Sequence, residues 1–185
     1  MIPDSSYDLT KSMFSRGNIS EKIRFSKFEV EDEIIVDCFV GLGYWVLQLS
    51  KKRPPLKVYC VDMNPNQLKS LERNIDLNKV DRNRFELIEG DCTKVQIPVK
   101  ANRVFLGLIP CCCFALEKAV SLLDRSKVGM VHVHHNYTDL TKVKHRPQGL
   151  VFEKNIFRIM NSTIVSAHWL TLCLLTRDAT TSVGQ

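Results

Sequence analysis

The chain has 185 residues, of which 44% are hydrophobic, so it is long and apolar enough to fold as one globular domain and not to stay disordered. Its formal net charge of +6 permits a polyanionic partner such as RNA, although an ordinary basic soluble protein can carry the same charge. The sequence lacks a run of about 18 apolar residues and its first residues lack the apolar stretch of a secretory signal, so we expect a cytoplasmic protein without a membrane span.

Apolar, β-branched runs alternate with amphipathic stretches along most of the chain. After a polar start, a helix is predicted over residues 19–28. The apolar runs then predict strands over residues 33–39, 56–62, 84–91, 102–110 and 127–136. The stretches between them predict helices over 44–52, 65–80 and 112–124. A polar stretch follows over 137–149, and the two last apolar runs, 155–165 and 168–176, fit an antiparallel pair.

Strands that alternate with helices predict an α/β, Rossmann-like fold with a mostly parallel central sheet and helices on both faces. The final pair of runs predicts a terminal antiparallel strand pair at one edge of that sheet. We therefore expect an N-terminal segment over 1–28, a domain over 29–177 and a tail over 178–185.

The cysteines and histidines do not indicate a metal site. The seven cysteines include no C-x-x-C pair, which is the spacing that many zinc sites use, and without a secretory signal we expect free thiols. Cys111, Cys112 and Cys113 are consecutive. His132 and His134 alternate onto one face of a predicted strand, but a third ligand is not evident.

Three acidic residues stand where predicted strands end. Asp37 closes the first strand and is followed by Gly41 and Gly43, which allow a tight turn and a close approach of a ligand to the backbone. Asp62 closes the second strand, where a carboxylate can accept hydrogen bonds from ribose hydroxyls. Asp91 closes the third strand. Each acid could instead cap a following turn, but ligands of open α/β sheets bind at this edge.

The glycine loop lacks the third glycine of G-x-G-x-x-G, and no G-K-[ST] follows, which argues against a dinucleotide and against a P-loop. The pattern D-x-F-x-G-x-G, with acids after strands two and three, resembles the class I methyltransferase plan. That plan binds S-adenosylmethionine; Asp91 would then face the adenine amino group, and Asp37 or the nearby backbone the methionine end.

Six segments in the same order carry a closer resemblance. They are MFSRGNISEKIR (13–24), VDCFVGLGYW (36–45), VDMNPNQLKSLERNIDLNKVDR (61–82), GD (90–91), NRVFLGLIP (102–110) and VHVHHN (131–136). Together they resemble the family that joins the aminocarboxypropyl-transferring enzymes of wybutosine synthesis with the tRNA guanine-N1 methyltransferases. The L-G-L-I-P run favours the wybutosine branch.

The resemblance implies a transferase that moves the 3-amino-3-carboxypropyl group of S-adenosylmethionine to the modified guanosine 3′ of the anticodon of tRNA-Phe. The implied partner is tRNA, with neither a metal nor a membrane, and we expect a monomer. Guanine-N1 methylation of the same tRNA region is the alternative within this class. A truncated or inactive relative that binds RNA or a protein partner is the alternative outside it.

The resemblance assigns site residues but identifies no catalytic one. It implies cofactor contacts for Phe14, Asn18, Glu21, Asp37, Gly41, Gly43, Asp62, Asn64, Asp91, Cys92, Leu106 and Pro110. It implies RNA contacts for Arg16, Lys22, Arg24 and Asn136, although the three basic residues could equally form a solvated face.

The chain also departs from the family pattern. Val40 stands where relatives usually have alanine, and Phe105 where they often have asparagine. Cys111, Cys112 and Cys113 replace a Ser-Ser-Glu type run, which removes polar groups near the expected acceptor. Phe105 and the cysteine run are the features that favour the inactive alternative.

Overall fold

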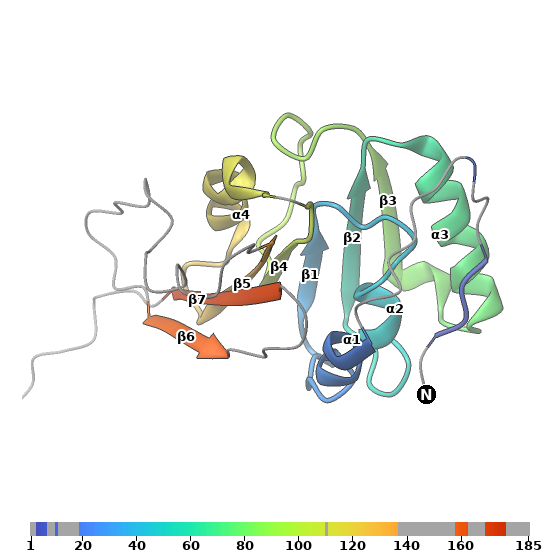
Figure 1. The fold of residues 1–185 in the computed structure, drawn as a ribbon, viewed down its shortest axis with the longest axis horizontal. Coiled ribbons are helices and arrows are strands. Elements are labelled where there is room, and N and C mark those ends of the chain that lie inside the picture. Colours follow the sequence, from blue (N-terminus) through green and yellow to red (C-terminus); the bar gives the residue numbers. More distant parts are fainter. Residues whose placement is uncertain are drawn as a thin grey trace, which may run out of the picture.

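The computed structural model of the protein describes residues 3–6, 10, 19–109, 111–136, 158–162 and 169–176. Its centre is a seven-stranded sheet in the order β3-β2-β1-β4-β5-β7-β6 (Figure 1). The strands are β1 (Ile34–Asp37), β2 (Lys57–Asp62), β3 (Phe85–Glu89), β4 (Arg103–Leu106), β5 (Gly129–Asn136), β6 (Arg158–Ser162) and β7 (Trp169–Thr176). The helices are α1 (Ile19–Phe25), α2 (Val46–Leu49), α3 (Pro65–Leu77) and α4 (Leu116–Leu122), with short 3₁₀ turns η1 (Arg82–Arg84) and η2 (Cys113–Ala115).

Strands β3, β2, β1, β4 and β5 run parallel, which confirms the predicted Rossmann-like, mostly parallel α/β fold. Strand β7 pairs antiparallel with β5 and with β6. The chain builds β2 and β3 on one side of β1 and then crosses to place β4 on its other side. The order of the strands therefore reverses at the β1–β4 pair, and ligands of open α/β sheets bind beyond the carboxyl ends of the strands at such a point.

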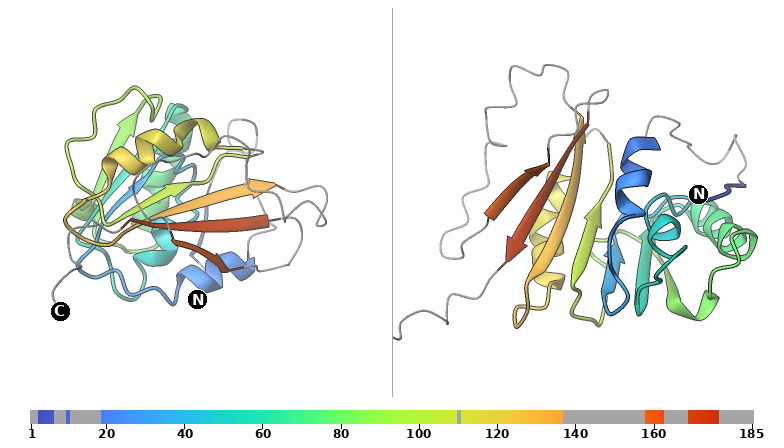
Figure 2. Two further views of the ribbon diagram at one scale, coloured as in Figure 1. Left: turned by 90° about the vertical axis from the view of Figure 1, so that its left-hand side faces the viewer. Right: turned by 90° about the horizontal axis from the view of Figure 1, so that it is seen from below.

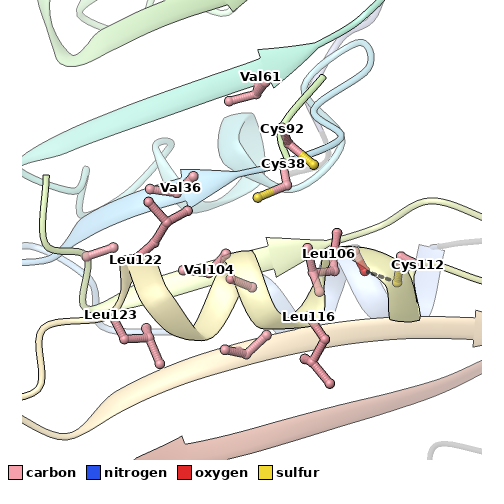
Figure 3. Packing of buried hydrophobic residues seen from close by; sticks show 14 of the residues in the cluster. Val36, Cys38, Val61, Cys92, Val104, Leu106, Cys112, Leu116, Leu122 and Leu123 are labelled. Carbon is pink, nitrogen blue, oxygen red and sulfur yellow. Dashed lines mark hydrogen bonds between the residues drawn. The ribbon is translucent and has the colours of Figure 1, made fainter. Parts of the chain in front are cut away.

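Helices cover both faces of the sheet. In the left view of Figure 2, α4 lies above the strands, whereas α1 and α2 lie below them. Alternate residues of one strand therefore enter two different cores: Val36 packs in the cluster beneath α4, and Ile35 packs in the cluster beneath α1, α2 and α3. Figure 3 shows the α4 side, where Leu116 and Leu122 meet Val104 and Leu106 of β4.

All four predicted helices are shorter than expected, and two of them differ at both ends. The helix predicted over 44–52 is reduced to α2, because residues 41–45 form turns that two glycines with positive φ initiate. The helix predicted over 112–124 begins as η2 and becomes α-helical only at Leu116, where no side chain caps its first turn. The predicted stretch 137–149 and the tail 178–185 lie outside the described residues.

The segment predicted to precede the domain packs against it. Phe25 of α1 is fully buried in the cluster that contains α2 and α3. Nearer the start, the N–H groups of Asp4 and Ser6 donate to the side-chain oxygens of Asn78 and Asn74, at 2.9 and 2.7 Å. Residues before the first strand thus contribute to the same core as the sheet.

A largely buried ion pair lies at the amino end of β4. The Arg103 guanidinium donates to both carboxylate oxygens of Glu33, at 2.6 and 2.7 Å, and its Nη1 lies 2.8 Å from Nε2 of His132. Burial and the neighbouring guanidinium lower the pKa of His132 well below its usual value, so this histidine is neutral and accepts the hydrogen bond.

Replacing Glu33 by alanine should lower the free energy of unfolding by about 3 kcal/mol, because it leaves the buried Arg103 charge without its partner. Urea unfolding of the two proteins measures the difference. Arg53→Ala is the matched control, since Arg53 pairs only at the surface, with the exposed side chains of Glu29 and Glu31, and should change stability by less than about 1 kcal/mol. Equal effects of the two substitutions would contradict a structural role for the Glu33–Arg103 pair.

Candidate functional site

The loops after β1 and β2 are joined through one carboxylate. Oδ2 of Asp62 accepts the N–H of Gly41, and Oδ1 accepts the N–H of Asn64, both at 2.9 Å. Asp62 was predicted to bind ribose hydroxyls, and its first role is to hold these two loops together. Each carboxylate oxygen retains a second acceptor site, so a diol can still be bound. Partial burial raises the pKa of Asp62.

The two glycines of the loop are required for different reasons. Gly41 has a φ of +55°, a conformation that other residues adopt only with strain, although a Cβ there would meet Tyr44 only at ordinary contact distance. Gly43 has a φ of +90°, and a Cβ there would lie 2.5 Å from Cδ1 of Leu71 in α3. Gly43 therefore lets the loop pack closely on α3, while Gly41 shapes the turn that presents its N–H to Asp62.

Asp37 is the carboxylate with an unsatisfied oxygen. Its Oδ1 accepts the N–H of Phe39 at 3.2 Å, but its buried Oδ2 has no hydrogen-bond partner among the residues that the structure describes. Burial, and to a smaller extent the nearby charge of Asp62, raises the pKa of Asp37 to about 7. A buried carboxyl group with one free oxygen beside a second carboxylate favours a positively charged ligand group.

Asp91 and Asn64 have local partners as well as their predicted roles. Oδ1 of Asp91 accepts the N–H and the hydroxyl of Thr93, at 2.9 and 2.7 Å, and these bonds lower the pKa of Asp91. The Asn64 side chain caps α3 by accepting the N–H of Asn66 at 2.9 Å. Cys92, which follows Asp91, is buried in the core cluster beneath α4 together with Cys38 (Figure 3).

The loop after β4 begins from a core residue. The Leu106 side chain is fully buried beneath α4, so any contact of Leu106 with a ligand would come from its backbone (Figure 3). A Cβ on the following Gly107 would lie 3.1 Å from Nε1 of Trp45, which shows how closely the loop approaches this indole. The Cys112 thiol is buried and lies 3.3 Å from the carbonyl oxygens of both Leu106 and His134.

Helix α1 brings charged groups to the face of the sheet opposite α4. Arg24 binds both carboxylate oxygens of Glu21, at 2.7 and 2.8 Å. Lys22 is only 7% exposed, its Nζ lies 5.0 Å from the centre of the Tyr44 ring, and burial lowers its pKa. Lys22 is therefore not on a solvated basic face.

Two aromatic side chains, those of Trp45 and His134, lie next to the charged groups of α1 and were not predicted as site residues. The His134 ring stacks on Trp45 with centroids 4.7 Å apart, and its Nε2 lies 4.0 Å from Glu21. Burial lowers the pKa of His134 to about 4, so its ring is neutral at pH 7. The only sequence signals were the tryptophan directly after the glycine loop and the second histidine of the strand.

The departures from the family pattern lie mainly in the core. Phe105 is fully buried and stacks on His132 with centroids 4.5 Å apart, and Cys112 is fully buried as well. Cys111 and Cys113 are half-buried at the edge.

Several predicted residues cannot be placed. Phe14, Arg16, Asn18 and Pro110 lie outside the described residues, and Asn136 is described only as the last residue of β5. Among the described residues, no group of three or more His, Cys, Asp and Glu side chains could hold a metal ion. No helix within the described part of the chain is long and apolar enough to span a membrane.

Asp37 should make stability depend on pH. In the unfolded chain its carboxyl group ionises near pH 4, whereas in the folded protein its pKa is about 7. The folded state thus binds the proton more tightly, and the stabilisation is complete below about pH 4 and is lost as the pH rises through 7. Asp37→Asn should remove this pH-dependent loss of folding stability. At about 1.4 kcal/mol per pKa unit, the loss is of the order of 4 kcal/mol.

Urea unfolding at pH 4, 6 and 8 measures this effect as the difference between the variant and the wild type. The exposed Asp32→Asn controls for the loss of a carboxylate elsewhere on the chain. Parallel pH profiles for Asp37→Asn and the wild type would show that the Asp37 carboxyl group is not held in its neutral form by burial.

Comparison with known proteins finds a matching family and related sequences. The family model described as the TRM5/TYW2 methyltransferase domain matches residues 5–163. The chain is 38% identical over 132 residues to the tRNA wybutosine-synthesizing protein 2 homolog of Danio rerio, covering 71% of this chain and 32% of that protein. It is 42% identical over 134 residues to the tRNA wybutosine-synthesizing protein 2/3/4 of Oryza sativa subsp. japonica, covering 72% of this chain and 13% of that one.

A solved structure shows the same fold. The crystal structure of M. jannaschii TYW2 in complex with AdoMet superposes with a TM-score of 0.74 at 27% identity, covering 93% of this chain and 80% of that chain. The protein spans about a third or less of the length of the two curated relatives described above. On the family model and these identities, the chain belongs to the TRM5/TYW2 methyltransferase domain family.

Proposed function

We propose that the chain transfers the 3-amino-3-carboxypropyl group of S-adenosylmethionine to the modified guanosine 3′ of the anticodon of tRNA-Phe, in wybutosine synthesis. The observation that carries the proposal is the buried Oδ2 of Asp37 at the β1–β4 switch point, which has no hydrogen-bond partner in the described part of the chain. The names of the wybutosine-synthesizing relatives, and of a solved relative that binds AdoMet, support the same reading.

The residues of the carboxyl edge fit such a cofactor. When bound, S-adenosylmethionine supplies a sulfonium that activates its carbon substituents for transfer. The free oxygen of Asp37 would bind a cationic group at the methionine end. Burial raises the pKa of this carboxyl group, and the nearby positive charge would stabilise its ionised form. Asp62 would hold the ribose hydroxyls with its remaining acceptor sites, and Asp91 the adenine amino group with Oδ2.

Whether the aminocarboxypropyl or the methyl group is transferred depends on how the protein positions the cofactor. Both groups are attached to one sulfonium, so the protein decides which carbon faces the base. The Asp37 carboxylate favours aminocarboxypropyl transfer if it holds the methionine end with the γ-carbon toward the loop after β4. Guanine-N1 methylation remains the alternative, since the matching family model covers both branches.

The acceptor side is proposed as tRNA, with a cytoplasmic monomer as the acting form. The net charge of +6 favours a polyanion. Of the four residues proposed to contact RNA, Lys22 is largely buried and Arg24 is paired with Glu21 in this structure. Arg16 and Asn136 are therefore proposed to make the main RNA contact. Phe105 and Cys112 are buried core residues, so these two departures replace no group on the open edge, which favours an active enzyme over an inactive relative.

The test is calorimetric titration of the chain with S-adenosylmethionine, followed by a product assay on tRNA-Phe that lacks the modification. We expect micromolar binding and formation of methylthioadenosine. Formation of S-adenosylhomocysteine instead would support methyl transfer. A folded chain that binds no S-adenosylmethionine would overturn the enzyme reading.

Asp91→Ala should weaken S-adenosylmethionine binding by about 1–3 kcal/mol through the loss of a hydrogen bond to a charged acceptor. Asp124→Ala is an unusually close control. Asp124 accepts the N–H and hydroxyl of Ser126 at 2.9 and 2.7 Å, as Asp91 does with Thr93, but it lies between α4 and β5, at the opposite edge of the sheet. Calorimetry should therefore show weaker S-adenosylmethionine binding for Asp91→Ala than for Asp124→Ala. Equal affinities of the two variants would show that Asp91 does not bind the cofactor.

A further inference from the structure

An exposed aromatic ring lies beside the candidate site. Phe114 is 61% exposed and is the only aromatic residue among the large exposed hydrophobic residues of the described chain. It belongs to η2, in the connection that leads from the carboxyl end of β4 to α4. Phe114 is thus close along the chain to Gly107 and Leu108 of the loop after β4, and Leu108 is itself 38% exposed.

A second ring supports it from the neighbouring strand. Phe39 follows the carboxyl end of β1, and its ring centroid lies 5.9 Å from that of Phe114 with an interplanar angle of 74°. Phe39 is half-buried and packs against the core cluster beneath α4. Because β1 and β4 are adjacent parallel strands, the two rings meet at the switch point of the sheet, next to Asp37.

The geometry of the pair leaves a ring surface accessible. In an edge-to-face contact one ring uses its edge, so the contact with Phe39 does not cover both faces of Phe114. An exposed phenylalanine adds nothing to the core, and a single ring is too small for an extended protein interface, which buries several hundred Å² on each partner. A flat π-surface at this size matches one nucleobase, and base–aromatic stacking is the common way in which proteins hold unstacked bases.

We propose that Phe114, supported by Phe39, is a stacking platform for an unstacked nucleobase of the tRNA substrate, next to the base that is modified. This inference rests on the proposed function, because it takes tRNA as the occupant. The net charge of +6 favours a polyanion over an apolar partner, and Lys94, in the loop after β3 at the same edge, has an 83% exposed side chain although its Nζ lies 3.6 Å from Oδ2 of Asp91. Phe114 positions the RNA and takes no part in the chemistry.

Photo-crosslinking tests the contact directly. An anticodon stem-loop RNA of tRNA-Phe, with 5-iodouridine placed in turn at the loop positions beside the target guanosine, is irradiated with the whole chain. We expect a crosslink in the peptide that contains Phe114, identified by mass spectrometry, and its loss in Phe114→Ala. Crosslinks confined to other peptides would overturn the proposal.

Binding of the same RNA, followed by fluorescence anisotropy, separates stacking from simple apolar contact. Phe114→Ala and Phe114→Leu should both weaken binding about 5- to 100-fold, and Phe114→Trp should retain it. Leu56→Ala is the matched control, since Leu56 is 58% exposed but directly precedes β2 at the opposite edge, and it should leave the affinity unchanged. Full binding by Phe114→Leu would contradict a stacking role.

Titration with S-adenosylmethionine distinguishes this inference from the proposed function. All Phe114 variants should bind the cofactor as the wild type does; a parallel loss would show that Phe114 lines the cofactor pocket and would overturn the platform. Failure of the wild type to bind S-adenosylmethionine would overturn the proposed function. Wild-type RNA affinity in Phe114→Ala, with cofactor binding intact, would overturn the platform alone.

Discussion

The carboxylate of Asp62 is the contact on which the geometry of the candidate site depends. One of its oxygens holds the loop after β1 through Gly41, and the other holds the loop after β2 through Asn64. The Gly41 turn needs a positive φ, and the loop that follows packs on α3 through Gly43. A single side chain therefore aligns two loops, and it does so before any ligand is bound. Preformed geometry of this kind lowers the ordering cost of binding.

Asp37 shows the opposite arrangement, in which the folded protein is left with an unfavourable group. A fully buried carboxyl oxygen without a hydrogen bond costs free energy, and a second carboxylate nearby adds to the cost. Such a group is uncommon in a core and is typical of a site where a ligand completes the hydrogen bonds. The free energy that the fold loses at Asp37 becomes available to the ligand that supplies a donor and a positive charge.

The sequence was sufficient to predict which residues lie at the ends of the strands but not the directions in which their side chains point. Asp37 and Asp62 end strands, and Asp91 follows one, whose apolar runs are unambiguous, so the acidic edge of the sheet could be inferred from pattern alone. Whether a side chain such as Leu106 or Phe105 faces a ligand or the core depends on which face of the strand it occupies and on the helix that covers it. Both are buried, and that packing involves residues far apart in the sequence.

Other differences have equally local causes. Lys22 appeared as part of a basic face, but Tyr44 from the glycine loop packs beneath its ammonium group. The helix predicted after the glycine loop was too long. Tyr44 and Trp45 fit its helical periodicity, but the turn formed by the positive-φ glycines keeps them out of α2. The stacking of Trp45 on His134 joins positions 89 residues apart, a relation that periodicity along one chain does not contain.

The thiol of Cys112 has a consequence for the spacing between β4 and β5. It lies between the carbonyl groups of Leu106 and His134, where the ladder between β4 and β5 ends, and it shares one hydrogen between two acceptors at 3.3 Å. A hydroxyl group makes such bonds at about 2.7–2.8 Å. The larger sulfur atom thus acts as a spacer between the carboxyl ends of two adjacent strands, which a serine at this position would hold closer together. Cys112 therefore sets the separation of these two carbonyl groups from within the core, where its own side chain is fully buried.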